Sequence, residues 1–172
     1  MIKYYSTKEL DPKLKSELQN FINVEFGDVP FVKERVWAQP DYVFVKYEGD
    51  AIVTFYQVII RNIALDGKSY PVAGINNVIT PPPFRGKGYS SQVLRETESI
   101  LFNKLQCSFG LLLCADALVP FYSRLNWYKV DTTLYYDQPQ GKQLYDSNVM
   151  LLTPSSQERI YPQHIDLNGL PW

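Results

Sequence analysis

The sequence predicts an α/β fold in which a mixed, mostly antiparallel central sheet is flanked by helices. Two observations predict it. Strand-like segments joined by tight turns fill the middle of the chain, and helical spacing of apolar residues begins after the prolines at 81–83. The length of 172 residues matches one domain of ordinary size, so we expect a single domain over residues 1–172.

The composition is that of a globular protein, with 45% hydrophobic and 20% charged residues. Seventeen Lys and Arg against eighteen Asp and Glu give a net charge of −1, which argues against a nucleic-acid partner. The one histidine, His164, and the spacing of Cys107 and Cys114 match no metal motif, so we expect no metal. No segment has the pattern of a signal peptide or the length of a membrane helix, so we expect a cytoplasmic protein without membrane contact.

A first helix is predicted to begin at Asp11, whose carboxylate can cap it, with Pro12 at the first helical position. Apolar residues then recur at helical spacing, as at Leu14 and Leu18. The helix is expected to stop at Gly27.

The middle of the chain predicts an antiparallel meander of three strands, over residues 41–47, 51–63 and 70–80. The segments that separate them, 48–50 and 65–68, contain Gly beside Asp, as tight hairpin turns do. The β-branched and aromatic residues of the three runs suit a pleated, half-buried surface.

A stiff connection and a helix follow the meander. Three prolines at 81–83 fit neither a strand interior nor a helix interior. After a Gly-rich loop at 85–90, apolar residues from Val93 to Leu101 fall on one helical face.

The last third of the chain predicts three more strands and a short helix. The wholly apolar run at 111–114 indicates a strand buried on both faces. Asp116 is expected to cap a short helix that holds Tyr122. The remaining strands are expected over 127–130 and 149–152.

The loop at 85–90 is the most informative segment for function. A strand ends before it and a helix begins after it, so that backbone N–H groups and a helix N-terminus converge on one point and favour an anion. Gly86 and Gly88 allow a ligand to approach the backbone, and Arg85 and Lys87 add positive charge. The anion that fits this arrangement most naturally is a pyrophosphate.

Two nucleotide-binding motifs with Gly-rich loops are excluded by spacing. A P-loop requires Gly-x-x-x-x-Gly-Lys-Ser/Thr, which this loop lacks. A dinucleotide-binding loop requires a third glycine where Gln92 stands, and it follows the first strand of a parallel unit rather than an antiparallel meander.

The loop Arg85-Gly86-Lys87-Gly88-Tyr89-Ser90 resembles the acetyl-coenzyme A motif of the GNAT superfamily of N-acetyltransferases, in which Arg or Gln is followed by any two residues and then by Gly-x-Gly/Ala. Ser90 departs from that pattern while remaining small. The segment from Leu111 to Trp127 resembles a second family element, a buried strand followed by a small helix with a tyrosine, here Tyr122. The resemblance implies the GNAT fold and acetyl-coenzyme A (acetyl-CoA) as co-substrate.

The resemblance also implies the chemistry: acetyl transfer from a thioester to a primary amine of a small cationic molecule. In the family, backbone on the central strand serves the thioester, which here corresponds to Asn77, Val78 and Ile79. Tyr122 takes the place of the general acid that protonates the leaving thiolate. The implied cofactor-binding residues of the loop are Arg85, Gly86, Lys87, Gly88, Tyr89 and Ser90.

A closer pattern resembles the aminoglycoside 2′-N-acetyltransferases: a meander after Trp37, the tripeptide Pro120-Phe121-Tyr122, and a tail ending in Trp172. Those enzymes have a Glu on the central strand, where this chain has Asn76. Asn cannot be a general base, so another group or a water chain takes the proton, or the substrate differs. Asp146 and Trp172 are the residues expected to bind a cationic acceptor.

Two alternative functions stay open at this point. One is acetylation of a protein or peptide on the same fold. The other is a catalytically silent GNAT-like module that binds coenzyme A, for which Asn76 in place of a carboxylate is the argument. The exposed aromatic strands are compatible with a homodimer.

Overall fold

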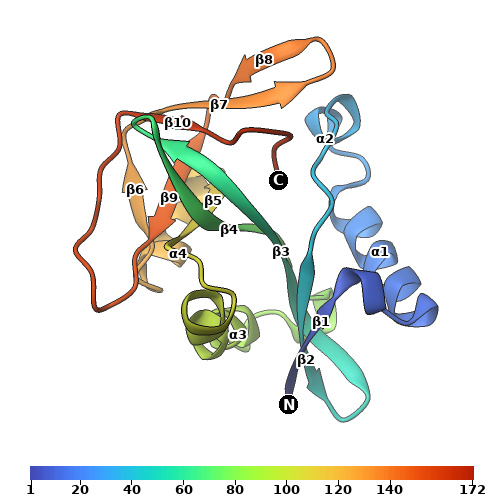
Figure 1. The fold of residues 1–172 in the computed structure, drawn as a ribbon. Coiled ribbons are helices and arrows are strands. Elements are labelled where there is room, and N and C mark those ends of the chain that lie inside the picture. Colours follow the sequence, from blue (N-terminus) through green and yellow to red (C-terminus); the bar gives the residue numbers. More distant parts are fainter.

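The computed structural model describes all 172 residues and confirms an α/β fold built on one ten-stranded, mostly antiparallel sheet (Figure 1). The strands are β1 (Ile2–Ser6), β2 (Tyr42–Glu48), β3 (Ala51–Leu65), β4 (Lys68–Ile79), β5 (Phe109–Cys114), β6 (Tyr128–Val130), β7 (Thr133–Gln138), β8 (Gly141–Leu144), β9 (Asn148–Leu152) and β10 (His164–Asp166). The helices are α1 (Pro12–Phe26), α2 (Pro30–Glu34), α3 (Tyr89–Ser99) and α4 (Val119–Ser123), with single turns η1 (Thr7–Glu9), η2 (Pro82–Phe84), η3 (Ile100–Lys104) and η4 (Asp116–Leu118).

The strands follow the order β6-β9-β5-β4-β3-β10-β7-β8, with β2 also paired to β3 and β1 to β2. Two neighbouring pairs are parallel, β4 with β5 and β10 with β7, and the other pairs are antiparallel. The predicted meander is confirmed as β2, β3 and β4. The predicted cap is confirmed as well, because the Asp11 carboxylate accepts the N–H of Lys13 at 2.8 Å and that of Leu14 at 3.3 Å.

The structure differs from the sequence expectations in its shortest elements. Asp116 does not cap the short helix: its carboxylate accepts the Asn148 Nδ2–H at 2.7 Å, and α4 follows the separate turn η4. Strands β1, β7, β8 and β10 and helix α2 carry no clear periodicity because each spans only three to six residues. The short strands are held in place by backbone pairing with their neighbours. For example, β10 pairs with β3 on one side and with β7 on the other.

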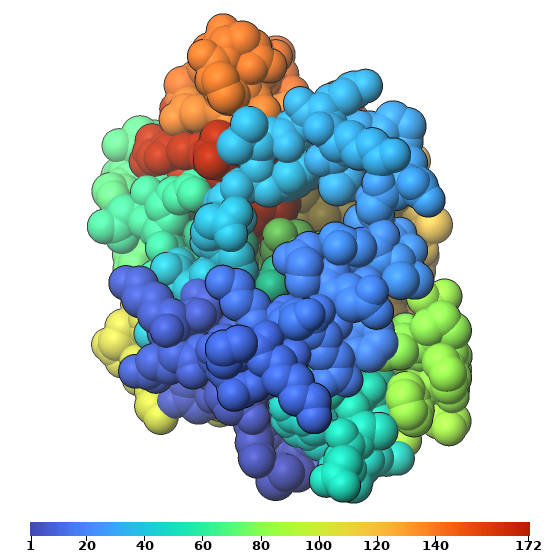
Figure 2. All heavy atoms as spheres, turned by 90° about the vertical axis from the view of Figure 1, so that its right-hand side faces the viewer, coloured from blue at the N-terminus to red at the C-terminus, as the bar shows by residue number.

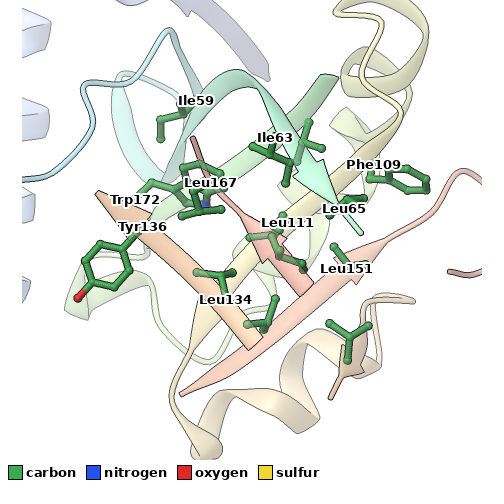
Figure 3. Packing of buried hydrophobic residues seen from close by; sticks show 14 of the residues in the cluster. Ile59, Ile63, Leu65, Phe109, Leu111, Leu134, Tyr136, Leu151, Leu167 and Trp172 are labelled. Carbon is green, nitrogen blue, oxygen red and sulfur yellow. The ribbon is translucent and has the colours of Figure 1, made fainter. Parts of the chain in front are cut away.

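The core covers both faces of the sheet, because successive residues of the central strands point to opposite sides. On one face Leu111 and Leu151 pack with the tail residues Leu167 and Trp172 (Figure 3). On the other face Leu112, the residue that follows Leu111 in β5, packs against apolar side chains of α3. The predicted strand buried on both faces is therefore confirmed as β5.

Strands β4 and β5 pair over only part of their length. Their parallel register runs from Val72 opposite Phe109 to Ile75 opposite Leu112 and stops there. On its other side β4 has a bulge, since β3 pairs with Asn76 and Ile79 but with neither residue between them. The bulge turns the end of β4 away from β5 and leaves a gap between the two strands.

The tail returns from the far edge of the sheet to the centre of the fold. The Pro171 carbonyl accepts the Ala38 N–H at 2.8 Å, and Arg61 donates to the carbonyls of Leu167 and Leu170 at 3.1 and 2.8 Å. The Trp172 ring then lies directly on the β4 backbone at Gly74, where a Cβ would collide with the ring. A glycine is required there by space.

We predict that Gly74→Ala lowers the free energy of unfolding by about 1–3 kcal/mol, because the added methyl group overpacks the contact with the indole. Urea denaturation followed by far-UV circular dichroism measures the change. On a Trp172→Ala background, which removes the ring, the same substitution should cost less than about 1 kcal/mol. Equal costs in the two backgrounds would show that the ring is not what excludes a side chain at residue 74.

Candidate active site

A cavity of about 750 Å³ opens beside the gap between β4 and β5. Its walls come from α1, α2, the segment 37–40, the ends of β4 and β5, and the tail. Figure 2 faces this side of the molecule and shows a hollow between the N-terminal segments. Green atoms of the central strands and red atoms of the tail are visible deep inside this hollow, near the centre of the view. The volume lies within the usual range for small-molecule sites.

The bulge of β4 forms the floor of the cavity. Asn77 has a positive φ of 48°, a conformation that Asn tolerates better than most residues. The Asn76 Oδ1 accepts the Asn77 N–H at 2.9 Å, and the Asn77 Nδ2–H is donated to Gln57 Oε1 at 2.8 Å. Of the three backbone residues that the sequence assigns to the thioester, Asn77 and Val78 line the cavity, whereas Ile79 is buried in the core beside α1.

Tyr122 reaches the cavity from α4. The side chain is buried, packs edge-on against Phe121 and Trp127, and has no hydrogen-bond partner on its hydroxyl among the protein atoms. Burial raises the pKa of the phenol well above its usual value, and the neighbouring thiol of Cys114 contributes in the same direction. Tyr122 is therefore a protonated donor without a partner.

Cys114 also lines the cavity, and the sequence analysis assigned it no role. Burial raises the pKa of its thiol to about 11, with a further contribution from Asp116. The thiol is therefore protonated at neutral pH and donates weakly to the sulfur of Met150, 3.7 Å away. A protonated thiol is a poor nucleophile, so Cys114 serves as an apolar part of the wall.

The loop before α3 presents a row of free backbone donors. Gly86 and Gly88 have φ of 76° and 77°, and a Cβ at either would meet nothing within 4 Å, so the backbone is open to a ligand. The N–H groups of Gly86, Lys87 and Gly88 have no backbone partner, and those of the first turn of α3 lack one by helix geometry. These donors at a helix N-terminus fit the pyrophosphate of acetyl-CoA.

The side chains of the loop are mostly engaged in holding its shape. Arg85 Nε donates to the Thr80 carbonyl at 3.0 Å, and its guanidinium pairs with Glu25 of α1 at 2.6 Å. Ser90 does not cap the helix: its hydroxyl shares a hydrogen bond of 2.6 Å with that of Thr80. The two residues thereby fix the start of α3 to the end of β4.

Lys87 is the exposed cation of the loop, with Nζ 5.7 Å from the centre of the Phe84 ring and no ion-pair partner. Tyr89, the first residue of α3, is half-buried and lies beneath the ammonium of Lys46 at 5.9 Å. The loop therefore contributes one exposed ammonium group, that of Lys87, and β2 places a second, that of Lys46, over the ring of Tyr89.

The two residues that the sequence assigns to the acceptor are not brought together. Trp172 is buried and lines the cavity. Asp146 is exposed and lies outside the lining, one residue beyond Tyr145, which does line it. The lining contains no Asp, Glu or His; its charged residues are Lys8 and Lys15. No cluster of three or more His, Cys, Asp and Glu side chains is placed to hold a metal ion, and no helix is long and apolar enough to cross a membrane.

Sequence reasoning missed most of the acceptor side of the cavity. Phe26, Phe31 and Trp37 line it together with Gln39 and Gln57. Trp37 alone was singled out, and only as part of a diffuse resemblance. The apolar residues of α1 and α2 that line the cavity have the spacing of residues that pack against a sheet, so no pattern distinguishes a wall from a core.

Solved structures with the same fold come from distant sequences. Escherichia coli ElaA is 15% identical, with a TM-score of 0.64 over 88% of this chain and 99% of its own. The E. coli GNAT family N-acetyltransferase YhbS, solved in complex with CoA, is 12% identical, with a TM-score of 0.62 over 97% and 88%. Arabidopsis thaliana NAA60, solved in complex with acetyl-CoA, is 13% identical, with a TM-score of 0.59 over 90% and 100%. A search of curated proteins finds no match.

A family comparison adds sequence evidence to this likeness of fold. The profile of a family described as an acetyltransferase (GNAT) domain matches residues 23–130, from the end of α1 through β6. The matched segment contains both the loop at 85–90 and Tyr122. Because it spans more than half of the 172 residues, the chain belongs to the GNAT family of N-acetyltransferases.

Proposed function

We propose that the protein transfers an acetyl group from acetyl-CoA to a primary amine of a small molecule that enters the cavity between α1, α2 and the tail. The observation that supports this proposal most directly is the unpartnered hydroxyl of Tyr122, which faces the cavity beside the gap between β4 and β5. A silent coenzyme A-binding module has no need of a buried, protonated donor at that place.

The donor end of the site is assigned to the loop and the gap. The N–H groups from Gly86 to the first turn of α3 hold the pyrophosphate, and Lys87 adds charge. When bound, acetyl-CoA supplies a thioester whose carbonyl carbon accepts the amine. Asn77 and Val78 have no partner in either neighbouring ladder, and the Asn77 N–H is taken by Asn76, so we assign polarisation of the thioester carbonyl to the Val78 N–H.

The amine must lose its proton before it attacks. The lining provides no carboxylate or imidazole for this step, and Asn76 is held in a backbone contact and cannot act as a base. The apolar walls instead disfavour the charged form of the amine, since desolvation lowers the pKa of an ammonium group. The proton leaves to solvent before or as the amine enters.

Tyr122 completes the reaction as general acid. Attack of the neutral amine forms a C–N bond and a tetrahedral intermediate, whose collapse breaks the C–S bond. Tyr122 donates its proton to the leaving thiolate, which becomes the thiol of coenzyme A. The nitrogen of the new amide loses its extra proton, which passes through water to the phenolate and restores the phenol. The free hydroxyl has no protein partner from which it must first be detached.

The finer assignment to an aminoglycoside or similar cation receives no support from the cavity. Aminoglycosides carry several positive charges, and sites for such ligands provide carboxylates that compensate them. The lining has none, and Asp146 lies outside it. The tail and α1 both border the cavity, which favours a small acceptor over an extended peptide or protein segment.

We expect Tyr122→Phe to lower kcat by about 100-fold or more, because it removes the proton donor and leaves the packing of the ring in place. Thiol release from acetyl-CoA, followed with a disulfide reagent, measures the rate, and the shift of Tm by coenzyme A shows whether binding is retained. The matched control is Tyr161→Phe at an exposed ring outside the cavity, which should leave kcat unchanged. Full activity of Tyr122→Phe contradicts the assignment.

Gly88→Ala should weaken coenzyme A binding, because a residue with a side chain avoids a φ of 77° and the loop would move its N–H donors away from the pyrophosphate. Gly49→Ala is the control: Gly49 also has a positive φ, of 56°, but lies in the β2–β3 turn. Both substitutions should cost roughly 1–2 kcal/mol of stability, and only the first should raise the Kd in calorimetry. Equal Kd values in the two variants argue against the loop as the pyrophosphate site.

The pH profile tests how the amine is deprotonated. Below the pKa of the free amine, kcat/KM should rise about tenfold per pH unit, as the neutral fraction of the amine does. Because burial raises the pKa of Tyr122, no falling limb from that phenol is expected up to about pH 10. The measurement uses two amines of different pKa. A shared inflection between pH 5 and 7, independent of the amine, would reveal an enzyme base that the structure does not show.

A further inference from the structure

We propose that the acceptor is a primary amine on an apolar, aromatic body that carries no second positive charge. This inference rests on the proposed function and deepens it, since it names the class of amine that enters the same cavity. Three observations lead to it: the aromatic residues of the lining, the cations beside them, and the absence of any carboxylate from the lining.

Aromatic rings form the acceptor side of the cavity. Phe31 and Trp37 lie with ring centroids 6.3 Å apart, and the Trp37 Nε1–H is donated to the Val32 carbonyl at 2.9 Å, which fixes the orientation of the indole. Tyr145 and Trp172 line the cavity from the other segments. Held rings of this kind bind flat apolar groups by area and by ring–ring contact.

Cations surround these rings. Lys8 and Lys15 line the cavity and have no ion-pair partner. The Arg35 guanidinium lies 5.4 Å from the ring centre of Phe31 and 6.0 Å from that of Tyr145, and Arg61 lies 5.4 Å from the Trp172 ring. None of the four is paired with a carboxylate in a salt bridge.

The carboxylates near this region lie outside the lining of the cavity. Asp41 accepts the Ile60 N–H at 2.7 Å, Glu25 pairs with Arg85, and Asp137 pairs with Lys142 at 3.0 Å. Asp146 is exposed to solvent and outside the lining. The lining of the cavity therefore holds two ammonium groups and no carboxylate, and the carboxylates that act on Arg61 and Tyr145 lie outside it.

These positive charges serve the reaction and select the substrate. Nearby positive charges and desolvation both lower the pKa of a bound ammonium group, which increases the neutral fraction that attacks the thioester. Once it has lost its proton, an amine with a single nitrogen carries no charge and is not repelled by the cations beside the cavity. A polycation retains its other charges beside the lysines and arginines, where repulsion opposes binding.

A panel of amines tests the inference, with rates of thiol release expressed per concentration of neutral amine. Phenethylamine and tryptamine represent the aromatic monoamines, butylamine a monoamine without a ring, and spermidine and a 2′-amino aminoglycoside the polycations. The aromatic monoamines should exceed both polycations about tenfold or more in kcat/KM, and should exceed butylamine. Mass spectrometry of the acetylated product confirms each turnover.

The outcomes separate the two proposals. Preference for a polycation, or equal rates with butylamine and the aromatic amines, overturns the inference about the acceptor and leaves acetyl transfer intact. No turnover with any amine, from protein whose Tm rises with acetyl-CoA, overturns both. The predicted ranking supports both.

A charge substitution provides an independent test. Gln39 is exposed, lines the cavity and makes no hydrogen bond with its side chain, so Gln39→Glu adds a carboxylate with little structural cost. It should raise the ratio of kcat/KM for spermidine over phenethylamine about fivefold or more, since the new charge offsets part of the positive charge of the lining. Gln157→Glu, at an exposed turn outside the lining, should leave the ratio unchanged. An unchanged ratio in Gln39→Glu, or equal rises in both variants, overturns the electrostatic argument.

Discussion

The parallel ladder between β4 and β5 ends at Ile75 and Leu112, and the site depends on that early end. The cause is local. Asn77 adopts a positive φ, the Asn76 side chain occupies its N–H, and the strand bulges away from its neighbour. If the ladder continued to the end of both strands, their backbone groups would pair with each other. The gap instead leaves room for a ligand arm and unpaired backbone beside it.

The elements that border the gap are held to the same two strands by polar contacts. The hydroxyls of Thr54, Thr80 and Ser90 form a chain of hydrogen bonds that joins β3 and the end of β4 to the start of α3. On the other side, β5 leads through η4 into α4, which delivers Tyr122. The free N–H groups therefore follow the end of β4, and the free hydroxyl of Tyr122 follows the end of β5, so the two lie on either side of the gap between these strands.

The cavity has no side chain in its lining that can act as a general base. Its lining has two lysines and no carboxylate. Burial raises the pKa of Tyr122 and keeps its hydroxyl protonated, and the Asn76 side chain accepts a hydrogen bond from the Asn77 backbone N–H. In the proposed mechanism no dedicated base is required, because the apolar walls and the neighbouring lysines both favour the neutral form of the amine. The Trp172 ring, pressed on Gly74, closes one wall with a residue from the end of the tail.

By itself the sequence determined the features that depend on neighbouring residues. The cap at Asp11, the hairpin meander, the buried strand β5 and the glycine loop before α3 are local patterns of spacing and turn chemistry, and the structure has all four. Only the tertiary structure decided the short strands, the burial of Trp172 against Gly74, the exclusion of Asp146 from the cavity and the aromatic wall. These features arise from contacts between residues far apart in the chain, and no local pattern records which apolar residues face a cavity and which face the core.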